Sequence, residues 1–327
     1  MRRFILISLL VFHCFACFAQ GAFEDYKIYQ LENNKYAFTD LQGNLIEKLG
    51  TWDEIEYFNI YRRQLSDREF VAVWEDSKEY YLDTLGNAYR VAHELSDPPN
   101  SKIQALDLYD HKQRFDTFPM EVLQYPNLQV LIIDGHYRDI NNFTTLPAEI
   151  VQLKALRFLS LRDGSLSTLP DNLDALAQLQ TLDLEGNQLA TLPESITKLQ
   201  NLNTLTLRYN YLATLPESIT KLQRLKGLDL GGNQLATLPE NITKLQNLNT
   251  LNLDAKQLTT LPKSITKLQK LKGLDLGGNQ LATLPESITK PQKLKVLKLG
   301  GNQLTTLPES IAQLQSLKKL ELGITQL

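Results

Sequence analysis

The stretch TLDLEGNQLATLPESITKLQN, residues 181–201, decides the fold, because closely similar letters return every 23 residues in the C-terminal part of the chain. Eight units begin at Leu156, Leu179, Leu202, Leu225, Leu248, Leu271, Leu294 and Leu317. The prolines from Pro147 to Pro308 keep the same step. A period of this size, sustained over eight units, predicts stacked structural repeats that close one another's apolar core.

Each unit is predicted to hold a short strand followed by a short helix. The alternation in TLDLEGN places Leu182 and Leu184 on one face and polar side chains on the other, as in a half-buried strand. In LPESITKLQ, Ile196 and Leu199 follow a helical spacing. Pro193 is expected in the first helical turn, where its missing amide donor leaves no bond unmade.

The general form LxxLxLxxNxLxxLPxxIxxLxx, over roughly residues 103–327, resembles the leucine-rich repeat proteins of the LPxxIxxL type. The resemblance implies an α/β solenoid with a curved horseshoe shape, a concave parallel sheet and a convex row of short helices. Because strands are narrower than helices, the stack is expected to curve with its strands inside.

An asparagine recurs after the strand of most units: Asn187, Asn210, Asn233, Asn279 and Asn302. We interpret this column as structural, because a buried amide can satisfy the backbone groups left open where a strand turns into a loop. Lys256 replaces the asparagine in one unit, where we expect a changed loop. Pro291 replaces a helix leucine and should distort one helix.

One unit is longer than the others. Leu128 and Leu156 are 28 residues apart, so this unit has five extra residues. We expect them in GHYRDINNF, residues 135–143, as a protruding loop. Such loops often carry recognition, and a neutral insertion is the alternative.

Residues 20–97 do not follow the 23-residue period. The segment YAFTDLQGN (36–44) aligns with EYYLDTLGN (79–87), which predicts two strand–turn–strand copies in a small antiparallel β module. This module resembles the WG-type β repeats of bacterial exported proteins, and capping the first repeat is its expected role. The junction with the repeat region 102–327 is expected at DPPNS, residues 97–101.

The chain begins MRRFILISLLVFHCFACFAQG, which has the layout of a secretory signal peptide over residues 1–19. Both cysteines, Cys14 and Cys17, lie in this leader, so the mature chain is expected to form no disulfide. An uncleaved anchor and a lipid attached at Cys17 are alternatives. We expect a periplasmic, cell-surface or secreted protein without a later transmembrane segment.

Composition and motifs argue against several functions. The chain has 34 Lys+Arg against 37 Asp+Glu, which excludes a generally basic nucleic-acid footprint. The sequence contains no GxSxG, GKS/T or HExxH motif, and no histidine belongs to a metal-spaced cluster. We therefore expect no enzymatic activity, no cofactor and no metal site.

The predicted helices carry a column of lysines: Lys198, Lys221, Lys244, Lys267 and Lys290. We interpret this column as solvated helix surface, because glutamates recur in the same units.

The outward strand positions form the candidate binding surface. Binding energy concentrates in aromatic and arginine side chains, which gather in the N-terminal units. The predicted site comprises Phe158, Arg162, Asp183, Glu185, Arg208, Tyr209 and Asp229. We expect a protein–protein interaction module that binds a protein or peptide on the concave face, with a solvated face as the simplest alternative. A structural or adhesive envelope protein, self-associating through its uncapped C-terminal repeat near Leu320 and Leu322, is the other alternative.

Overall fold

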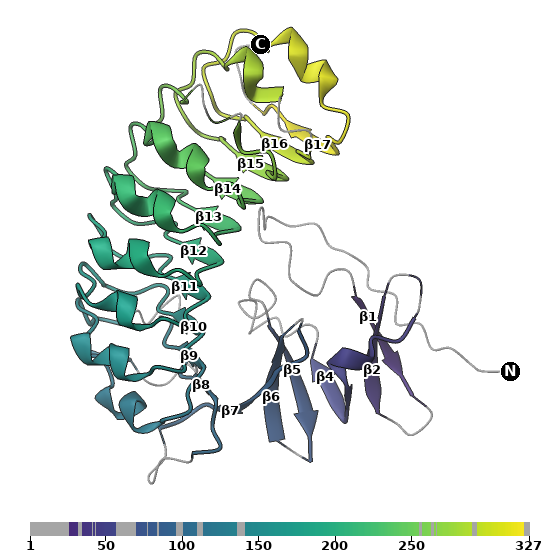
Figure 1. The fold of residues 1–327 in the computed structure, drawn as a ribbon, viewed down its shortest axis with the longest axis vertical. Coiled ribbons are helices and arrows are strands. Elements are labelled where there is room, and N and C mark those ends of the chain that lie inside the picture. The colour runs from purple at the N-terminus through teal and green to yellow at the C-terminus, as the bar shows by residue number, and fades with distance from the viewer. Residues whose placement is uncertain are drawn as a thin grey trace, which may run out of the picture. The chain divides into compact units, whose positions relative to one another are not determined.

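The computed structural model describes residues 26–31, 35–40, 42, 44–56, 70–76, 78–83, 85–95, 101–109, 114–135, 141–254, 257–262, 265, 267–289 and 293–323. The chain divides into two compact units, Met1–Asp107 and Leu108–Leu327 (Figure 1). The predicted leader 1–19 with Cys14 and Cys17, and the deviating residues Lys256, Lys290 and Pro291, lie outside the described residues.

The second unit is a stack of coils, each with a three-residue strand. The strands are β9 (Val130–Ile132), β10 (Phe158–Ser160), β11 (Thr181–Asp183), β12 (Thr204–Thr206), β13 (Gly227–Asp229), β14 (Thr250–Asn252), β15 (Gly273–Asp275), β16 (Val296–Lys298) and β17 (Lys319–Glu321). Neighbours pair in parallel, with Leu182 opposite Leu205 and Leu205 opposite Leu228. The predicted repeat frame and solenoid are confirmed, and the strands line the inner side of the curved stack (Figure 1).

Short 3-10 helices form the outer side of the stack. They are η2 (Met120–Gln124), η3 (Ala148–Gln152), η4 (Leu173–Ala175), η5 (Glu194–Lys198), η6 (Glu217–Lys221), η7 (Glu240–Lys244), η9 (Glu286–Thr289) and η10 (Glu309–Gln313). Pro193 precedes η5 instead of lying in its first turn, so that prediction is wrong by one position. The tighter 3-10 turn explains this, because the Pro193 carbonyl already accepts a hydrogen bond from the Ile196 N–H at 3.2 Å.

The core of the stack consists of leucines that meet between coils. Leu182, Leu205 and Leu228, at the centres of three adjacent strands, are buried. Full burial of a leucine side chain contributes about 2 kcal/mol, so the repeated column is a major source of stability. At the last strand, by contrast, Leu320 is 38% exposed.

The asparagine column forms the predicted ladder. The Asn187 amide donates to the carbonyls of Leu161 at 2.7 Å and Leu184 at 3.1 Å, and its Oδ1 accepts the Leu166 N–H at 3.0 Å. The same pattern recurs at Asn210, Asn233, Asn279 and Asn302. Each asparagine therefore joins two coils through backbone groups that would otherwise be buried without partners.

The ladder also locates the insertion. Asn141, which the sequence analysis did not assign to the column, donates to the Ile133 carbonyl and accepts the Phe115 N–H. Asn141 pairs with Gly164, 23 positions on, whereas Ile132 in β9 pairs with Ser160, 28 positions on. The five extra residues therefore lie between Ile132 and Asn141, as expected. Residues 136–140 lie outside the described part of the chain.

The first unit is β-rich. It contains β1 (Tyr26–Gln30), β2 (Tyr36–Asp40), η1 (Glu47–Leu49), β3 (Thr51–Trp52), β4 (Glu54–Glu56), β5 (Phe70–Glu75), β6 (Lys78–Asp83), β7 (Ala88–Ala92) and β8 (Ala105–Asp107). Strands β1 to β3 form one antiparallel sheet, and β4 to β7 continue antiparallel in a second. The predicted small antiparallel module is confirmed, although β7 and β8 pair in parallel.

The two predicted copies in this module share a turn. Asp40 Oδ1 accepts the Asn44 N–H at 2.8 Å, and Asp83 Oδ1 accepts the Asn87 N–H at 2.9 Å. After the turn the copies differ, because η1 interrupts the first copy before β3. The first copy still pairs back on β2 after its turn, since the Ile46 N–H donates to the Phe38 carbonyl at 2.8 Å, but η1 separates this pairing from β3. Both copies contribute to one buried cluster that includes Phe38 and Leu82.

Across the described residues, no helix combines the length and apolar character that crossing a lipid bilayer requires.

Candidate functional site

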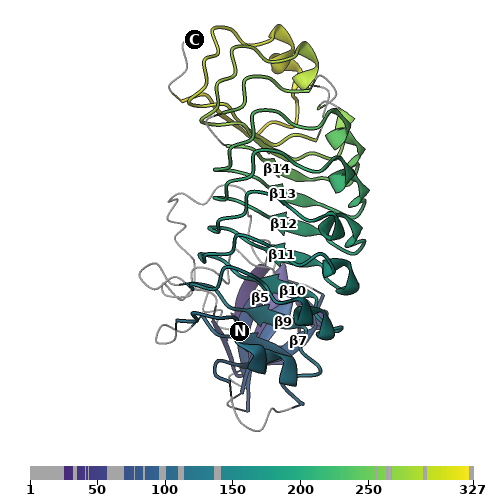
Figure 2. The same ribbon diagram turned by 90° about the vertical axis from the view of Figure 1, so that its left-hand side faces the viewer.

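The outward side chains of the strands form a surface on the inner side of the second unit. We call this surface the strand ribbon; it comprises the outward residues of β10 to β16 and the residues two and three positions after each strand. Strands β9 to β14 cross the stack side by side (Figure 2). Because paired strands lie about 4.8 Å apart, a side chain on the ribbon lies close to its counterparts in the neighbouring coils.

Arg162 holds the first cluster of the ribbon together. Its Nε donates to Asp183 Oδ2 at 2.6 Å, and its Nη2 lies 3.1 Å from Glu185 Oε2. The Glu185 N–H donates to Asp183 Oδ1 at 3.2 Å. The backbone N–H of Arg162 donates to buried Asp134, which also accepts the Ser160 hydroxyl at 2.7 Å. The predicted residues Arg162, Asp183 and Glu185 thus form one ion-paired group across two coils.

Arg208 forms a second cluster that spans three coils. Its guanidinium makes a bidentate pair with Asp254, with Nη2 and Oδ2 2.7 Å apart. Gly231 lies between them, and a Cβ at this position would overlap both Asp254 Oδ1 and Arg208 Nη1. We call Arg208, Gly231 and Asp254 the arginine clasp. The predicted residue Asp229 lies beside it, with Oδ1 3.9 Å from Arg208 Nη1.

Tyr209 and Tyr211 are the exposed aromatic side chains beside the clasp. Tyr209 is 53% exposed and Tyr211 is 54% exposed. The Arg208 guanidinium carbon lies 4.3 Å from the centre of the Tyr209 ring, and Arg208 Nη2 donates to the Tyr209 hydroxyl at 2.7 Å. A cation above an aromatic ring is attracted to the face of the ring, so Arg208 and Tyr209 hold each other in place.

The backbone at Tyr209 is in a left-handed conformation, with φ of 54°. The equivalent positions in the adjacent coils are Gly186 and Gly232, with φ of 69° and 66°. A left-handed conformation costs a residue with a side chain about 1 kcal/mol relative to glycine. This coil therefore carries a large exposed ring at a position where the flanking coils carry no side chain.

Two carboxylates of the ribbon have raised pKa values. Burial raises the pKa of Glu185 from 4.5 to about 7; Arg162 opposes this shift and the negative charge of Asp183 adds to it. Burial also raises the pKa of Asp229 from 3.8 to about 6, although the Gly231 N–H and the Arg208 guanidinium favour its charged form. The ribbon therefore holds acids that are costly to ionise.

The structure brings most of the predicted site residues together, but the aromatic ring of one of them is buried. Phe158 is 2% exposed, so the expectation that its ring lies open on the ribbon is wrong. Its register partners, Val130 in β9 and Thr181 in β11, are buried as well. The exposed aromatic side chains lie farther along the stack, at Tyr209 and Tyr211.

Sequence reasoning did not select Asp254 or Tyr211 for the site. Asp254 lies 46 residues, or two repeat periods, after Arg208, and the repeat pattern did not show that the two side chains meet across Gly231. Tyr211 could have been found, because it replaces the glutamine that follows the asparagine in neighbouring units, at Gln188 and Gln234.

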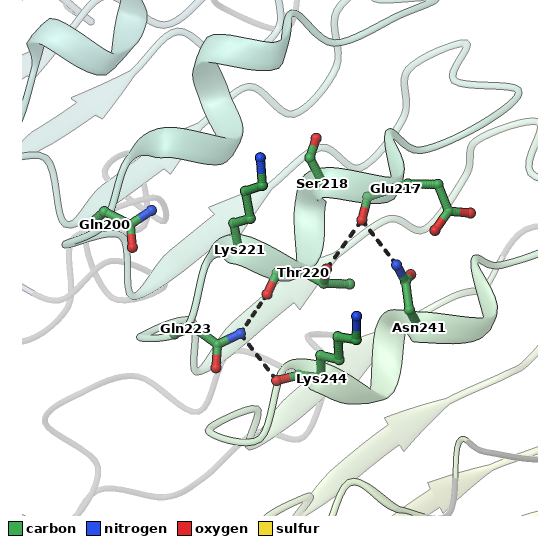
Figure 3. A pocket seen from close by; sticks show the side chains of 8 residues that line it. All are labelled: Gln200, Glu217, Ser218, Thr220, Lys221, Gln223, Asn241 and Lys244. Carbon is green, nitrogen blue, oxygen red and sulfur yellow. Dashed lines mark hydrogen bonds between the residues drawn. The ribbon is translucent and has the colours of Figure 1, made fainter.

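A shallow hollow lies between η6 and η7 on the outer side of the stack (Figure 3). Lys221, Lys244 and Glu217 line it, and Asn241 donates to the Glu217 carbonyl at 3.3 Å. Among the described residues, no group of three His, Cys, Asp or Glu side chains is placed to hold a metal ion. The hollow does not bring together groups suited to acid–base or nucleophilic chemistry.

Comparisons with known proteins agree with the repeat frame. A family model described as a leucine-rich repeat region matches residues 111–211, and a second, described as a Leucine Rich Repeat, matches residues 293–314. A solved leucine-rich repeat protein of Leptospira interrogans is 34% identical, with 69% of this chain and 67% of that chain covered and a TM-score of 0.49. No curated protein matches the chain in sequence.

Two structures solved with ligands are also similar. The plant peptide hormone receptor RGFR1 in complex with RGF2 is 22% identical, with 69% of this chain and 40% of that chain covered and a TM-score of 0.54. The TLR13–ssRNA13 complex is 29% identical, with 69% of this chain and 33% of that chain covered and a TM-score of 0.58. The chain thus spans less than half the length of either ligand-bound protein.

Proposed function

Because the chain belongs to the leucine-rich repeat proteins, we propose that its second unit is a non-enzymatic recognition module that binds a protein or peptide on the strand ribbon. The observation that carries this proposal is the pair of exposed rings, Tyr209 and Tyr211, beside the clasped Arg208. Tyrosine and arginine dominate the binding energy of protein interfaces.

The rigidity of this patch supports the proposal. Arg208 is already held by Asp254 and by the Tyr209 hydroxyl, so a partner would not have to immobilise its long side chain. Immobilising such a side chain costs about 1 kcal/mol on binding. The backbone strain at Tyr209 points the same way, because strained residues concentrate at functional sites.

The charge of the ribbon supports a protein or peptide partner over a nucleic acid. Asp183, Glu185, Asp229 and Asp254 surround two arginines that are already paired. Phosphate groups would meet these carboxylates with few free cations to offset the repulsion. The ssRNA bound by TLR13 is therefore not transferred to this chain as a ligand.

The wider proposal is a secreted or envelope-associated receptor-like module. It rests on the leader predicted over residues 1–19. Extracellular recognition would suit a solenoid whose stability comes from leucine packing without disulfides.

The test uses a double variant that copies the neighbouring coils. Tyr209→Gly with Tyr211→Gln gives this coil the residues found at the equivalent positions on one side, Gly186 and Gln188. A partner is first identified through a photo-crosslinker placed at Tyr211 in the full chain. Binding of that partner should then fall about 1,000-fold in the double variant, since hot-spot residues contribute roughly 2 kcal/mol or more each.

The matched control is Gln188→Ala with Gln234→Ala, which changes exposed side chains in the two flanking coils. This control should keep its affinity for the partner. The Tyr209→Gly, Tyr211→Gln variant should also keep its unfolding midpoint, because glycine relieves the left-handed strain. Unchanged affinity in a folded double variant would refute the tyrosine patch as the binding site.

The alternative function is a structural or adhesive envelope protein that self-associates near the last strand. Leu320 in β17 is 38% exposed, whereas the corresponding leucine in β16, Leu297, is buried. Analytical ultracentrifugation over a concentration series distinguishes the two functions. A monomer at all concentrations would reject self-association and leave the recognition proposal untouched.

A further inference from the structure

One edge of the second unit has an unusual charge pattern. The six-residue segments that lead from each helix into the next strand, such as LQKLKG at residues 268–273, contain no Asp or Glu in any of the eight units. Because the strands pair in parallel with a constant register, these segments align along the edge where the strands begin. The acidic residues of the strand ribbon lie toward the other end of each strand.

Lysines accumulate along this edge in the C-terminal coils. Seven of them are exposed. Lys319 is paired with Glu321, and we call the other six the lysine edge: Lys226, Lys270, Lys272, Lys293, Lys295 and Lys318. The Lys295 N–H donates to the Lys272 carbonyl at 2.7 Å, and the Lys318 N–H donates to the Lys295 carbonyl at 2.7 Å. These three residues therefore occupy consecutive rungs, about 5 Å apart.

The charges of the lysine edge are not compensated. Within the described part of the chain, none of the six ammonium groups has a carboxylate partner, and Lys270 donates to the neutral Asn247 side chain at 2.6 Å. Like charges directly opposite on neighbouring strands destabilise a sheet. A row of like charges on consecutive strands thus lowers the stability of the fold, and the six lysines have no carboxylate partner within the described part of the chain that would offset this cost.

By contrast, a lysine on the strand ribbon of the same coils has a carboxylate partner. Lys298 lies 3.4 Å from Asp275, and both side chains are buried. The acid closest in sequence to Lys272 is Asp275, three residues farther, which is about 10 Å along an extended strand. Salt screens most of the interaction over that distance, since the Debye length is about 10 Å at 0.1 M. The edge is therefore locally basic although the chain has a net charge of −3.

The positive charge continues onto the adjoining helices. Lys221 and Lys244 end η6 and η7, immediately before these segments, and both line the shallow hollow (Figure 3). Their ammonium groups are exposed. Glu217, which also lines the hollow, lies at the opposite end of η6, four residues before Lys221.

We propose that the lysine edge docks the second unit on an anionic lipid surface. The residue types select this occupant. Besides their leucines, the C-terminal segments, from residue 268 onward, contain lysine, glutamine, proline, valine and small residues but no aromatic side chain or arginine, so they lack the usual anchors of a protein interface. Lysine is a flexible point charge suited to diffuse attraction by many headgroups, whereas arginine suits bidentate recognition.

The position of the lysine edge also favours a lipid surface over a nucleic acid. A nucleic acid that followed the lysines would come within reach of Asp229, Asp254 and Asp275 on the ribbon, which repel phosphate. A lipid surface touching only the edge avoids these carboxylates and leaves the strand ribbon open. The inference therefore does not depend on the proposed binding site at Tyr209.

The experiment measures binding of the purified full chain to vesicles of phosphatidylcholine alone and of an equal mixture of phosphatidylcholine and phosphatidylglycerol. We expect sedimentation with the mixed vesicles only, and release at about 1 M salt, where the Debye length falls to about 3 Å. Equal binding to both vesicles would indicate insertion of an apolar segment and would overturn the proposal.

The decisive variant is Lys272→Gln with Lys295→Gln and Lys318→Gln. Its affinity for mixed vesicles should fall about 100-fold, since each lysine near an anionic surface contributes roughly a fivefold factor. The matched control, Gln188→Glu with Gln234→Glu and Gln303→Glu, lowers the net charge by the same three units at the opposite edge. This control should retain binding, and so should Lys272→Arg with Lys295→Arg and Lys318→Arg.

Two results would overturn the proposal. The first is an equal loss of binding in the lysine variant and in the glutamine control, which would show a general effect of net charge. The second is binding of a poly-glutamate peptide or a DNA duplex, but not of mixed vesicles, that the lysine variant abolishes. Unfolding midpoints of all variants should be no lower than that of the unchanged chain, which separates docking from folding.

Discussion

The two faces of the same short strands differ in how strictly they repeat. Toward the core, Leu182, Leu205 and Leu228 are identical and buried. On the ribbon, the residues that follow them are Asp183, Thr206 and Asp229, with different partners in each coil. The inward side chains must pack in the same way in every coil, whereas the outward side chains are free to vary. Differences between coils on the ribbon therefore indicate function more directly than conserved spacing does.

The largest effect is expected from breaking the inward face. Asn210→Ala removes the acceptor of the Leu189 N–H and the donor to the Leu184 and Leu207 carbonyls. Leaving such buried groups without partners should lower the free energy of unfolding by about 3 kcal/mol. Urea denaturation followed by circular dichroism measures the change.

Thr214→Ala, an exposed position in the same coil, is the matched control. It should change stability by less than about 0.5 kcal/mol. Equal losses in the two variants would mean that the ladder contributes no more than ordinary surface residues.

A smaller effect on stability is expected from protonating the partly buried acids of the strand ribbon. The folded chain raises the pKa of Glu185 to about 7, above its ordinary value of 4.5, so the folded state binds this proton more tightly than the unfolded state. Stability should therefore rise as the pH falls from above 7 toward 4.5. The gain should be about 2 kcal/mol, less than the full shift implies, because the Glu185 side chain is still 23% exposed.

Glu185→Gln should remove this part of the pH dependence, measured as the unfolding midpoint at a series of pH values. Asp229→Asn should flatten the lower part of the curve, because burial raises the pKa of Asp229 from 3.8 to about 6. A pH profile unaffected by either substitution would contradict the proposed desolvation of these acids.

The smallest effect on stability is expected from a substitution that separates the arginine clasp. Gly231→Ala places a Cβ against Arg208 and Asp254, which must separate or shift. Loss of this part-buried pair should cost about 1 kcal/mol, because the flexible ends of both side chains can still reach water. Gly277→Ala, at the same position two coils on, is the control, since its nearest atom is Asp275 Oδ1 at 3.2 Å. Equal losses would show that Gly231 serves general packing and not the clasp.

Much of the architecture could be predicted from the sequence. The register of the strands, the asparagine ladder and the position of the five extra residues before Asn141 all follow from spacing. The prediction for Pro193 was wrong by one residue, because spacing alone does not distinguish a 3-10 turn from an α-helical turn. The resemblance between Asp40 and Asp83 anticipated the shared turn but not the interrupting helix η1.

The candidate site was less accessible to sequence reasoning. Spacing placed Arg162, Asp183 and Glu185 on one surface, and the structure joins them in one cluster. The same reasoning placed Phe158 on the open ribbon, although its ring is buried. Alternation specifies the face toward which a side chain points, but it does not specify what covers that face.

The sequence alone was sufficient to predict the coil, its 23-residue period and its buried asparagine ladder. These features depend on backbone groups that need a hydrogen-bond partner at the same position of every coil. Three-dimensional packing was needed for the pairing of Arg208 with Asp254 across Gly231 and for the separation of the lysine edge from the acids. Side-chain reach, free volume and distance from solvent govern these features. None of those quantities is encoded in spacing along the chain.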